Sequence, residues 1–374
     1  MRVALVSFDF GEYSVRLASG LSRAADVTLL VPWPVVEPHL KALDPRVYLQ
    51  PFVKPRLRQP GRQIRMCLEL VRRIKAFQPD VVHVQHGHLW FNFFLPLLRR
   101  YALVLTVHDA RHHIGDKVSK KTPQSVMDFG FRWASRLIVH VSYVKRVIAD
   151  ECGIPEAGID VVPHISLGSA FASVPVRERE PTILFFGRIW EYKGLEYLIR
   201  AEPFITREVP DAKIVIAGHG DDFDRYRRQM VNVDRFVVHN EHISEERRAE
   251  LFRHASVVVL PYIEASQSGV VPLAYAWAKP VVATTVGGLP EMIDDGVTGY
   301  LVPPRDERAL AAASVRLLRD ERLRRELGMN GKRRLDRECR PGVIAEQTLA
   351  SYRQALLPRR YGLRSVAAGR GGIS

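Results

Sequence analysis

The chain has 374 residues, more than one hydrophobic core usually supports, so two domains of ordinary size are expected. Its net charge of +14 favours anionic partners, whether a nucleotide sugar, an acidic membrane surface or nucleic acid, but does not choose among them. Three widely separated cysteines lack metal-ligand spacing and favour free thiols in a reducing compartment, and no apolar run reaches the roughly 18 residues of a spanning helix. The protein is therefore expected to be cytoplasmic, either soluble or peripheral on the inner face of a membrane.

Short β-branched runs alternate with helix-compatible sequence through the first half of the chain. The expected strands are 3–8, 27–31, 81–84, 103–107 and 137–141. Strands that alternate with helices predict right-handed crossovers and a parallel, doubly wound sheet. Residues 1–165 are therefore predicted to form a Rossmann-like domain.

The segment 54–75 is strongly basic. It carries an apolar stripe at helical spacing: Ile64, Leu68, Val71 and Ile74. Such a helix either packs its stripe on the sheet or lies on an anionic lipid surface. The aromatic run 89–95 leaves two similar alternatives, a core helix or an insertion into a membrane. Contact with a membrane is therefore a hypothesis that the sequence raises without deciding.

Polar side chains follow two of the expected strands in the first half. They are His86, His88, His108, Asp109 and His112. Ligands of a parallel sheet bind at the carboxyl ends of its strands, so these side chains are candidates for one site. The alternative for His108 is a histidine that is hydrogen-bonded at the start of a loop. The others fit the lining of an acceptor site better than a metal site, because neither a fixed scaffold nor a second shell can be identified, and no metal is expected.

The second half repeats the alternation after a break. Residues 166–181 lack an apolar period and are predicted to be a linker. The strands expected beyond it are 182–186, 213–217, 235–238, 257–260 and 281–283. They predict a second Rossmann-like domain over 182–340, and the cleft between two such sheets is the expected active site if their strand ends face each other.

The C-terminal part is predicted to begin with a helix over 308–319. A second helix is predicted over 341–357. Residues 358–374 are basic, rich in glycine and short of apolar periodicity, and are therefore predicted to be a disordered tail.

A glycine-flanked loop with two cations follows the strand 182–186. Arg188 offers a planar fork of donors and Lys193 a compact charge, while Gly187 and Gly194 let the backbone approach a ligand. Two cations in this arrangement are suited to grip a diphosphate. The alternative is a pair of solvated cations on a surface loop.

The strand 257–260 leads into Glu264 and then into an apolar segment that begins at residues 268–270. Pro272 is tolerated there if it lies in a first helical turn. The amides of Ser268, Gly269 and Val270 would then be unpaired donors at a helix N-terminus, which favours an anion. A buried helix capped by a serine is the alternative, but it does not account for Glu264 at the strand end.

The double glycine Gly287-Gly288 follows the strand 281–283. Such a turn brings backbone close to a ligand, although a purely structural turn needs the same glycines. Five motifs now stand in order between about 182 and 304: Gly-Arg-x4-Lys-Gly, a Glu before Ser-Gly-x2-Pro, Pro-Val-Val-Ala-Thr, Gly-Gly-x-Pro-Glu and Gly-x-Thr-Gly-x-Leu-Val. In order and spacing they resemble the motifs of the retaining glycosyltransferases of family four, whereas the first half resembles the family in pattern only.

The resemblance implies the GT-B fold, which consists of two Rossmann-like α/β domains with doubly wound parallel sheets facing across a cleft. In this fold the C-terminal helix, here 341–357, would cross back onto the first domain. It implies transfer of a hexosyl group from a nucleotide diphosphate sugar to a saccharide or lipid-linked saccharide, as in polysaccharide biosynthesis, without a metal. Arg188 and Lys193 would hold the diphosphate, Glu264 the sugar hydroxyls, and His108 would lie near the donor sugar. The other expected donor contacts are Gly11, Gly187, Ser268, Gly269, Val270, Gly287 and Gly288. His86, His88, Asp109 and His112 would line the acceptor side.

One position departs from the family pattern. Members usually carry a second Glu eight residues after the first, which holds the nucleotide ribose, and here that residue is Pro272. The ribose would then be held by backbone, by another acid, or more weakly. Alternatives to the transferase are a sugar-nucleotide epimerase or a noncatalytic sugar-nucleotide binder, and more remotely a nucleic-acid-binding protein, for which no module signature is found.

Overall fold

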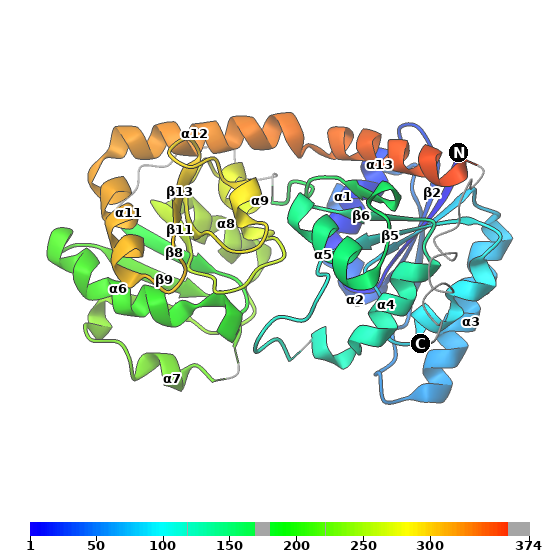
Figure 1. Ribbon diagram of the computed structural model, residues 1–374, viewed down its shortest axis with the longest axis horizontal. Helices are drawn as coiled ribbons and strands as arrows, with labels where there is room; N and C mark the ends of the chain where they lie inside the picture. The colour runs from blue at the N-terminus through cyan, green and yellow to red at the C-terminus, as the bar shows by residue number, and fades with distance from the viewer. Residues whose placement is uncertain (118, 169–179, 221, 358–374) are drawn as a thin grey trace, which may run out of the picture. The chain divides into compact units, whose positions relative to one another are not determined.

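A computed structural model describes residues 1–117, 119–168, 180–220 and 222–357. The predicted tail and most of the predicted linker lie outside these ranges. The chain divides into two compact units (Figure 1). The first contains residues 1–112, 117–165 and the described residues from 340 onward, and the second contains 113–116 and 166–339.

The first unit is built on a parallel sheet of seven strands in the order β3-β2-β1-β4-β5-β6-β7. The strands are β1 (Arg2–Ser7), β2 (Asp26–Pro32), β3 (Tyr48–Phe52), β4 (Val81–Gln85), β5 (Ala102–Val107), β6 (Arg136–Val139) and β7 (Ile159–Val161). The buried apolar runs became the central strands, as expected of a parallel sheet that is covered on both faces. The sequence did not predict β3 and β7, which are the two edge strands and carry little continuous apolar sequence.

Helices cover this sheet. They are α1 (Gly11–Leu21), α2 (Trp33–Val36), α3 (Pro60–Phe77), α4 (Gln124–Trp133), α5 (Ser142–Cys152) and α13 (Pro341–Leu356), with the 3₁₀ helices η1 (Glu37–Ala42), η2 (Phe91–Leu98), η3 (Ser119–Lys121) and η4 (Glu156–Gly158). The C-terminal helix α13 packs against α1, β5 and β6 (Figure 1). Gly20 permits this contact, because a Cβ there would lie 2.6 Å from the Pro341 carbonyl oxygen.

The structure corrects the apolar stripe that was predicted for the basic helix α3. Val71 and Ile74 are buried as expected, but Ile64 and Leu68 are exposed. The face that packs inward is instead formed by Gln63, Met66, Cys67, Leu70, Val71 and Ile74. These positions follow the 3.6-residue period more closely than the predicted set, which drifts off the buried face at its N-terminal end.

The second unit is built on a parallel sheet of six strands in the order β10-β9-β8-β11-β12-β13. The strands are β8 (Thr182–Phe186), β9 (Lys213–Ala217), β10 (Phe236–His239), β11 (Val257–Leu260), β12 (Val281–Thr284) and β13 (Gly299–Val302). All but β13 were predicted to within one residue. β13 occupies a sheet edge and is the second half of the motif Gly-x-Thr-Gly-x-Leu-Val, which was not predicted to be a strand.

The helices of the second unit are α6 (Leu195–Glu208), α7 (Asp224–Arg227), α8 (Glu245–His254), α9 (Val270–Ala276), α10 (Leu289–Met292), α11 (Glu307–Arg319) and α12 (Glu321–Glu338), with the 3₁₀ helices η6 (Glu191–Lys193) and η7 (Val233–Arg235). Alternation along β8 separates two cores: Ile183 and Phe185 join the apolar cluster of α6 and α11, whereas Leu184 joins that of α8 and α9. In the described ranges, no helix combines the length and the hydropathy needed to cross a membrane.

Candidate functional site

The loop after β8 is held in place by close backbone contacts. Gly187 has φ +110, and Gly194 has φ +62, conformations that favour glycine. A Cβ on Gly194 would lie only 2.0 Å from the Pro261 carbonyl oxygen, just beyond β11. The Ile263 N–H donates to the Tyr192 carbonyl oxygen at 2.9 Å. The cationic loop and the loop after β11 therefore form one surface.

Lys193 is buried between aromatic rings. Its side-chain Nζ lies 3.8 Å from the ring centroid of Tyr262 and 4.9 Å from that of Tyr192, and the residue is only 9% exposed. No carboxylate forms an ion pair with it among the described residues. Burial by itself lowers the pKa of Lys193, but the two tyrosines outweigh burial and raise it. The ammonium is therefore charged, enclosed and without an acidic partner.

Tyr262 connects this lysine to the start of α9. Its hydroxyl lies 3.3 Å from Ser268 Oγ, which also accepts a hydrogen bond from the Val270 N–H at 3.3 Å. The expectation that the amides of residues 268–270 are all unpaired is therefore wrong for Val270, because the Ser268 hydroxyl accepts from that N–H. Pro272 lies in the first turn of α9, as the sequence predicted, and is buried.

Glu264 lies in the loop between β11 and α9. Its Oε2 accepts a hydrogen bond from the Ile114 N–H at 3.1 Å and lies 3.7 Å from His113 Nδ1. The side chain is 37% exposed, so part of the carboxylate faces solvent. The loop itself is held by Gly287, which has φ +53 and leaves no room for a Cβ, 1.5 Å from the Ala265 carbonyl oxygen. Gly288 then precedes the first residue of α10.

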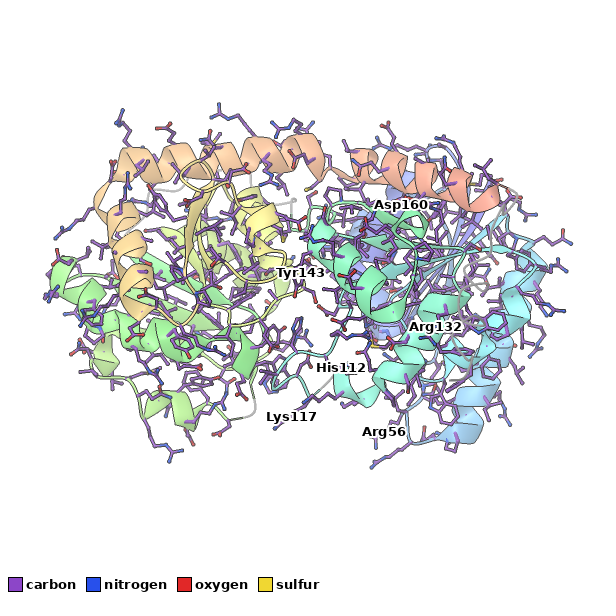
Figure 2. The ribbon with its side chains drawn as sticks, in the orientation of Figure 1. Arg56, His112, Lys117, Arg132, Tyr143 and Asp160 are labelled. Atoms are coloured by element: carbon purple, nitrogen blue, oxygen red, sulfur yellow. The ribbon has the colours of Figure 1, made fainter. Side chains whose placement is uncertain are left out.

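Arg188 projects from the same loop as Lys193 but is half exposed. Its Nη1 lies 3.9 Å from Asp116 Oδ2, and the Asp116 side chain is buried. Asp116 belongs to the segment 113–116, which is part of the second unit although it follows β5 in the chain. His112 and Lys117, labelled in Figure 2, lie on either side of this segment.

The first unit contains a chain of buried polar side chains. His108, directly after β5, stacks on Phe10 with ring centroids 3.9 Å apart. Its Nδ1 lies 3.2 Å from His140 Nε2, and its Nε2 lies 3.3 Å from Gln85 Oε1. The chain continues from Gln85 to His83, whose Nδ1 pairs with the Tyr352 hydroxyl at 2.6 Å. His108 is thus at the predicted strand end, with both ring nitrogens occupied within the first unit.

The hydrogen-bond directions in this chain can be assigned. Burial lowers the pKa of His140 to about 3 and that of His108 well below its usual value, so both rings are neutral. His140 Nδ1 donates to the Val162 carbonyl oxygen at 2.9 Å, so its Nε2 accepts from His108 Nδ1. His108 Nε2 is then an acceptor, which requires the Gln85 amide to turn its nitrogen toward it.

The candidate acceptor-side histidines carry unused ring nitrogens. Within the described ranges, His86 Nδ1, His88 Nε2 and both nitrogens of His112 are buried and have no hydrogen-bond partner. His86 also has φ +63, a conformation that costs a non-glycine residue energy and is often found at functional sites. Asp109 is half-buried between them in sequence. Four buried nitrogens without partners are suited to a polar ligand or to ordered water.

Gly11 has a structural explanation in this fold. It is the first residue of α1, and a Cβ there would lie 2.0 Å from the Val35 carbonyl oxygen of α2. The glycine is therefore required for the contact between α1 and α2. Its contact with a donor stays a prediction.

Comparison with known proteins identifies the family. The profile described as Glycosyltransferase Family 4 matches residues 11–165, and the profile described as Glycosyl transferases group 1 matches residues 180–320. An uncharacterized glycosyltransferase of Methanocaldococcus jannaschii is 36% identical over 316 residues, which cover 78% of this chain and 80% of that protein. The chain belongs to the family 4 glycosyltransferases.

Other relatives and structures agree with this assignment. The D-inositol 3-phosphate glycosyltransferase of Kineococcus radiotolerans is 31% identical over 256 residues, covering 60% of this glycosyltransferase and 58% of the relative. HepE of Anabaena, solved in complex with UDP and glucose, superposes with a TM-score of 0.72 at 15% identity, covering 95% of this chain and all of that one. The fold is therefore GT-B, as the resemblance implied, with two parallel-sheet α/β domains.

Sequence reasoning missed four residues of this glycosyltransferase's second-unit site. Tyr192 lies directly before Lys193 and Tyr262 two residues before Glu264, and their rings enclose Lys193. An aromatic residue next to a motif cation was a signal that could have found Tyr192. His113 and Asp116 had no such signal, because they lie far from the motifs in the chain. Only folding brings His113 to Glu264 and Asp116 to Arg188.

Proposed function

We propose that this glycosyltransferase is a retaining enzyme that moves a sugar from a nucleotide diphosphate sugar to a saccharide or lipid-linked saccharide acceptor. The observation that carries the proposal is the Lys193 ammonium, which is buried against Tyr262 and without an acidic partner in the described part of the chain. A buried charge without a counter-ion is costly, and an anionic ligand such as a diphosphate would remove that cost.

Arg188 and Lys193 have complementary roles in this proposal. Lys193 supplies a fixed charge, because its aromatic surroundings hold the ammonium in one place. Arg188 is half exposed and can present a planar fork to a second phosphate. Gly187 approaches the start of α9, which Ser268 and Gly269 precede, since a Cβ on Gly187 would lie 3.8 Å from Val270 Cγ2. Ser268 Oγ also lies 3.3 Å from the hydroxyl of Tyr262, whose ring contacts Lys193. Together they would stabilise the negative charge that develops on the departing diphosphate.

Glu264 is assigned to the hydroxyls of the donor sugar. Gly287 and Gly288 hold its loop and would let backbone approach the donor. His108 is kept as the donor-facing histidine of the first unit, although one of its internal hydrogen bonds would have to open for a ring nitrogen to reach a sugar. His86, His88, Asp109 and His112 are assigned to the acceptor side, and the ring nitrogens of the three histidines that lack a partner in the described ranges support this assignment.

Retention follows if the acceptor attacks from the face that the leaving group departs from. The bond between the sugar C1 and the phosphate oxygen breaks, and a bond between C1 and the acceptor oxygen forms on the same face. The proton of the acceptor hydroxyl passes to the departing phosphate oxygen. This scheme assigns no step to a metal and none to a protein nucleophile.

A lipid-linked acceptor would be reached at a membrane surface, and α3 supports such contact. Its exposed face carries cations, among them Arg62 and Arg65, and also the exposed apolar residues Ile64 and Leu68. The adjoining η2 adds the exposed side chains of Phe93 and Leu97. Cations interspersed with exposed apolar side chains are typical of a surface that lies on anionic lipid.

The transfer itself is tested with labelled nucleotide sugars. UDP-glucose is the first donor to test, because HepE of Anabaena was solved with UDP and glucose, and GDP-mannose and ADP-glucose follow. A transferase releases nucleoside diphosphate only when an acceptor is present, whereas an epimerase needs no acceptor and a binder releases none. The proposal would be contradicted if no combination of donor and acceptor gave acceptor-dependent release of nucleoside diphosphate.

Lys193→Met tests whether the buried charge of Lys193 is needed for transfer. The substitution keeps the length of the side chain and removes its charge, so turnover is expected to fall at least about 100-fold, since one well-placed group contributes about 3 kcal/mol. Lys193→Arg is expected to restore only part of this activity, because a planar fork does not replace a point charge. Near wild-type transfer by a folded Lys193→Met protein would remove this residue from the role.

A further inference from the structure

The segment His113–Asp116 forms a tight turn in the second unit. The Asp116 N–H donates to the His113 carbonyl oxygen at 3.2 Å, and Gly115 has φ +74. A bond from the fourth residue to the first, with a positive φ at the third, is the signature of a type II turn. Ile114 then occupies the second position, where proline is also common. A Cβ on Gly115 would lie 2.7 Å from Glu191 Cβ, so the turn fits closely against η6.

The turn contacts Glu264 through one oxygen only. Both the Ile114 N–H, at 3.1 Å, and His113 Nδ1, at 3.7 Å, approach Oε2. Oε1 has no hydrogen-bond partner among the described residues, and the side chain is 37% exposed. The carboxylate is therefore held at one oxygen and presents the other outward.

His113 contacts both the Glu264 loop and Tyr192. Its Nε2 accepts from the Ser266 N–H at 3.3 Å, so a neutral ring carries its proton on Nδ1, the nitrogen nearest Glu264. The ring stacks on Tyr192 with centroids 4.6 Å apart, and the Tyr192 N–H donates to the Ile114 carbonyl oxygen at 3.3 Å. One imidazole thus links the Glu264 loop to a tyrosine that also contacts Lys193.

At its other end the turn meets Arg188. The distance from Asp116 Oδ2 to Arg188 Nη1 is 3.9 Å, which is the outer limit of an ion pair, and the guanidinium remains half exposed. A loose pair of this kind orients a guanidinium without using most of its N–H groups. The turn therefore touches two of the residues that are assigned to the donor, Glu264 and Arg188, and among the described residues it leaves each with unused hydrogen-bonding groups.

We infer that the turn His113–Asp116 is a positioning element for the donor sugar, in which the Ile114 N–H and His113 hold Glu264 so that Oε1 accepts a sugar hydroxyl. The inference rests on the proposed donor-binding role of Glu264. Neither His113 nor Ile114 contacts the donor in this arrangement. Both act through the orientation of the carboxylate, while the diphosphate is left to Arg188 and Lys193.

The contribution of the amide can be removed selectively. Ile114→Pro suits the second position of a type II turn but lacks the N–H that Glu264 accepts, whereas Ile114→Ala shortens the side chain and keeps that N–H. His113→Asn keeps a donor near Glu264 but loses the stacking on Tyr192, and His113→Ala loses both. Thermal unfolding of each variant reports whether it is folded.

The measurement is the preference for a nucleotide sugar over the bare nucleotide. Dissociation constants for UDP-glucose and UDP, GDP-mannose and GDP, and ADP-glucose and ADP are measured by calorimetry, and the pair that the wild type binds is then used for the variants. Ile114→Pro is expected to lose about tenfold in sugar nucleotide affinity relative to Ile114→Ala, with affinity for the bare nucleotide within about twofold. His113→Ala should lose the same preference, and His113→Asn should restore part of it.

Three results would overturn the inference. The first is equal affinity of Ile114→Pro and Ile114→Ala for the sugar nucleotide, and the second is an equal loss for sugar nucleotide and bare nucleotide, which indicates a structural role. The third is tighter donor binding by Ile114→Pro and His113→Ala, which would mean that the turn blocks the site. If Ile114→Pro does not fold, the two His113 variants decide by the same comparison. Absence of nucleotide binding by the wild type contradicts the proposed function instead.

Discussion

Lys193 and Glu264 of the second unit differ from His108 of the first unit in how many of their hydrogen-bonding groups the fold has already used. In the second unit, Lys193 has aromatic neighbours and no acid among the described residues, and Glu264 is held by one oxygen. In the first unit, a hydrogen bond between His108 Nδ1 and His140 Nε2 uses one ring nitrogen of each residue inside a buried chain of polar side chains. Both sets follow strand ends in the sequence. Whether such a residue is available to a ligand depends on how many of its hydrogen-bonding groups the fold itself has already used.

The largest expected effect concerns the buried histidines of the first unit. Burial lowers the pKa of His83 and His140 to about 3 and that of His88 and His164 to about 4. The folded protein keeps these rings neutral, while the unfolded chain binds protons below about pH 6.5. Stability is therefore fully present above that pH and is lost as the pH falls toward 4. Each histidine contributes up to about 2 kcal/mol to this loss between pH 7 and pH 5.

Hydrogen exchange at pH 7 and pH 5, corrected for the intrinsic pH dependence, measures this loss in each unit separately. The strands β4, β5 and β6 are expected to lose protection, and β8 and β11 to lose much less. Equal losses in the two units would remove the contrast between them.

A smaller effect is expected from glycine substitutions in the second unit. Gly287→Ala places a Cβ against the Ala265 carbonyl oxygen, whereas Gly296→Ala meets no atom within 4 Å, although Gly296 also has a positive φ of +71. The conformational cost, about 1–2 kcal/mol, is therefore shared by both variants. Gly287→Ala should unfold at lower urea concentration than Gly296→Ala and should also lose donor affinity, because the Glu264 loop moves. Identical behaviour of the two variants would mean that this close contact does not hold the loop.

The smallest effect concerns the exposed face of α3 in the first unit. Replacing Arg62 and Arg65 of α3 by glutamine should weaken binding to phosphatidylglycerol vesicles by about 1 kcal/mol per cation, or about fivefold each. The control replaces two exposed cations of α12, Arg322 and Arg333, by glutamine, which gives the same net charge. Cosedimentation measures the partition of both proteins. No binding by the wild type, or an equal loss in both variants, would count against a membrane-directed face.

The sheet strands could be predicted where they are buried and apolar. β8, β9 and β11 were predicted with their observed bounds, because a central parallel strand is covered on both faces and reads as a continuous apolar run. Three edge strands, β3, β7 and β13, were missed, whereas the edge strand β10 was predicted to within one residue because it begins with the apolar run Phe-Val-Val. The prediction of the buried stripe on α3 was partly wrong, because Ile64 and Leu68 are apolar side chains that the fold leaves exposed.

The sequence by itself determined the family, the parallel architecture, the cationic loop around Arg188 and Lys193, and Pro272 at the position where the family resemblance implies an acid. These properties depend on local composition and spacing. Only the tertiary structure decided that Tyr192 and Tyr262 enclose Lys193, that the histidines of the first unit bond to one another, and that a turn from residues 113–116 holds Glu264. Burial and hydrogen-bond partnership arise between segments that are far apart in the chain, so no local pattern encodes them.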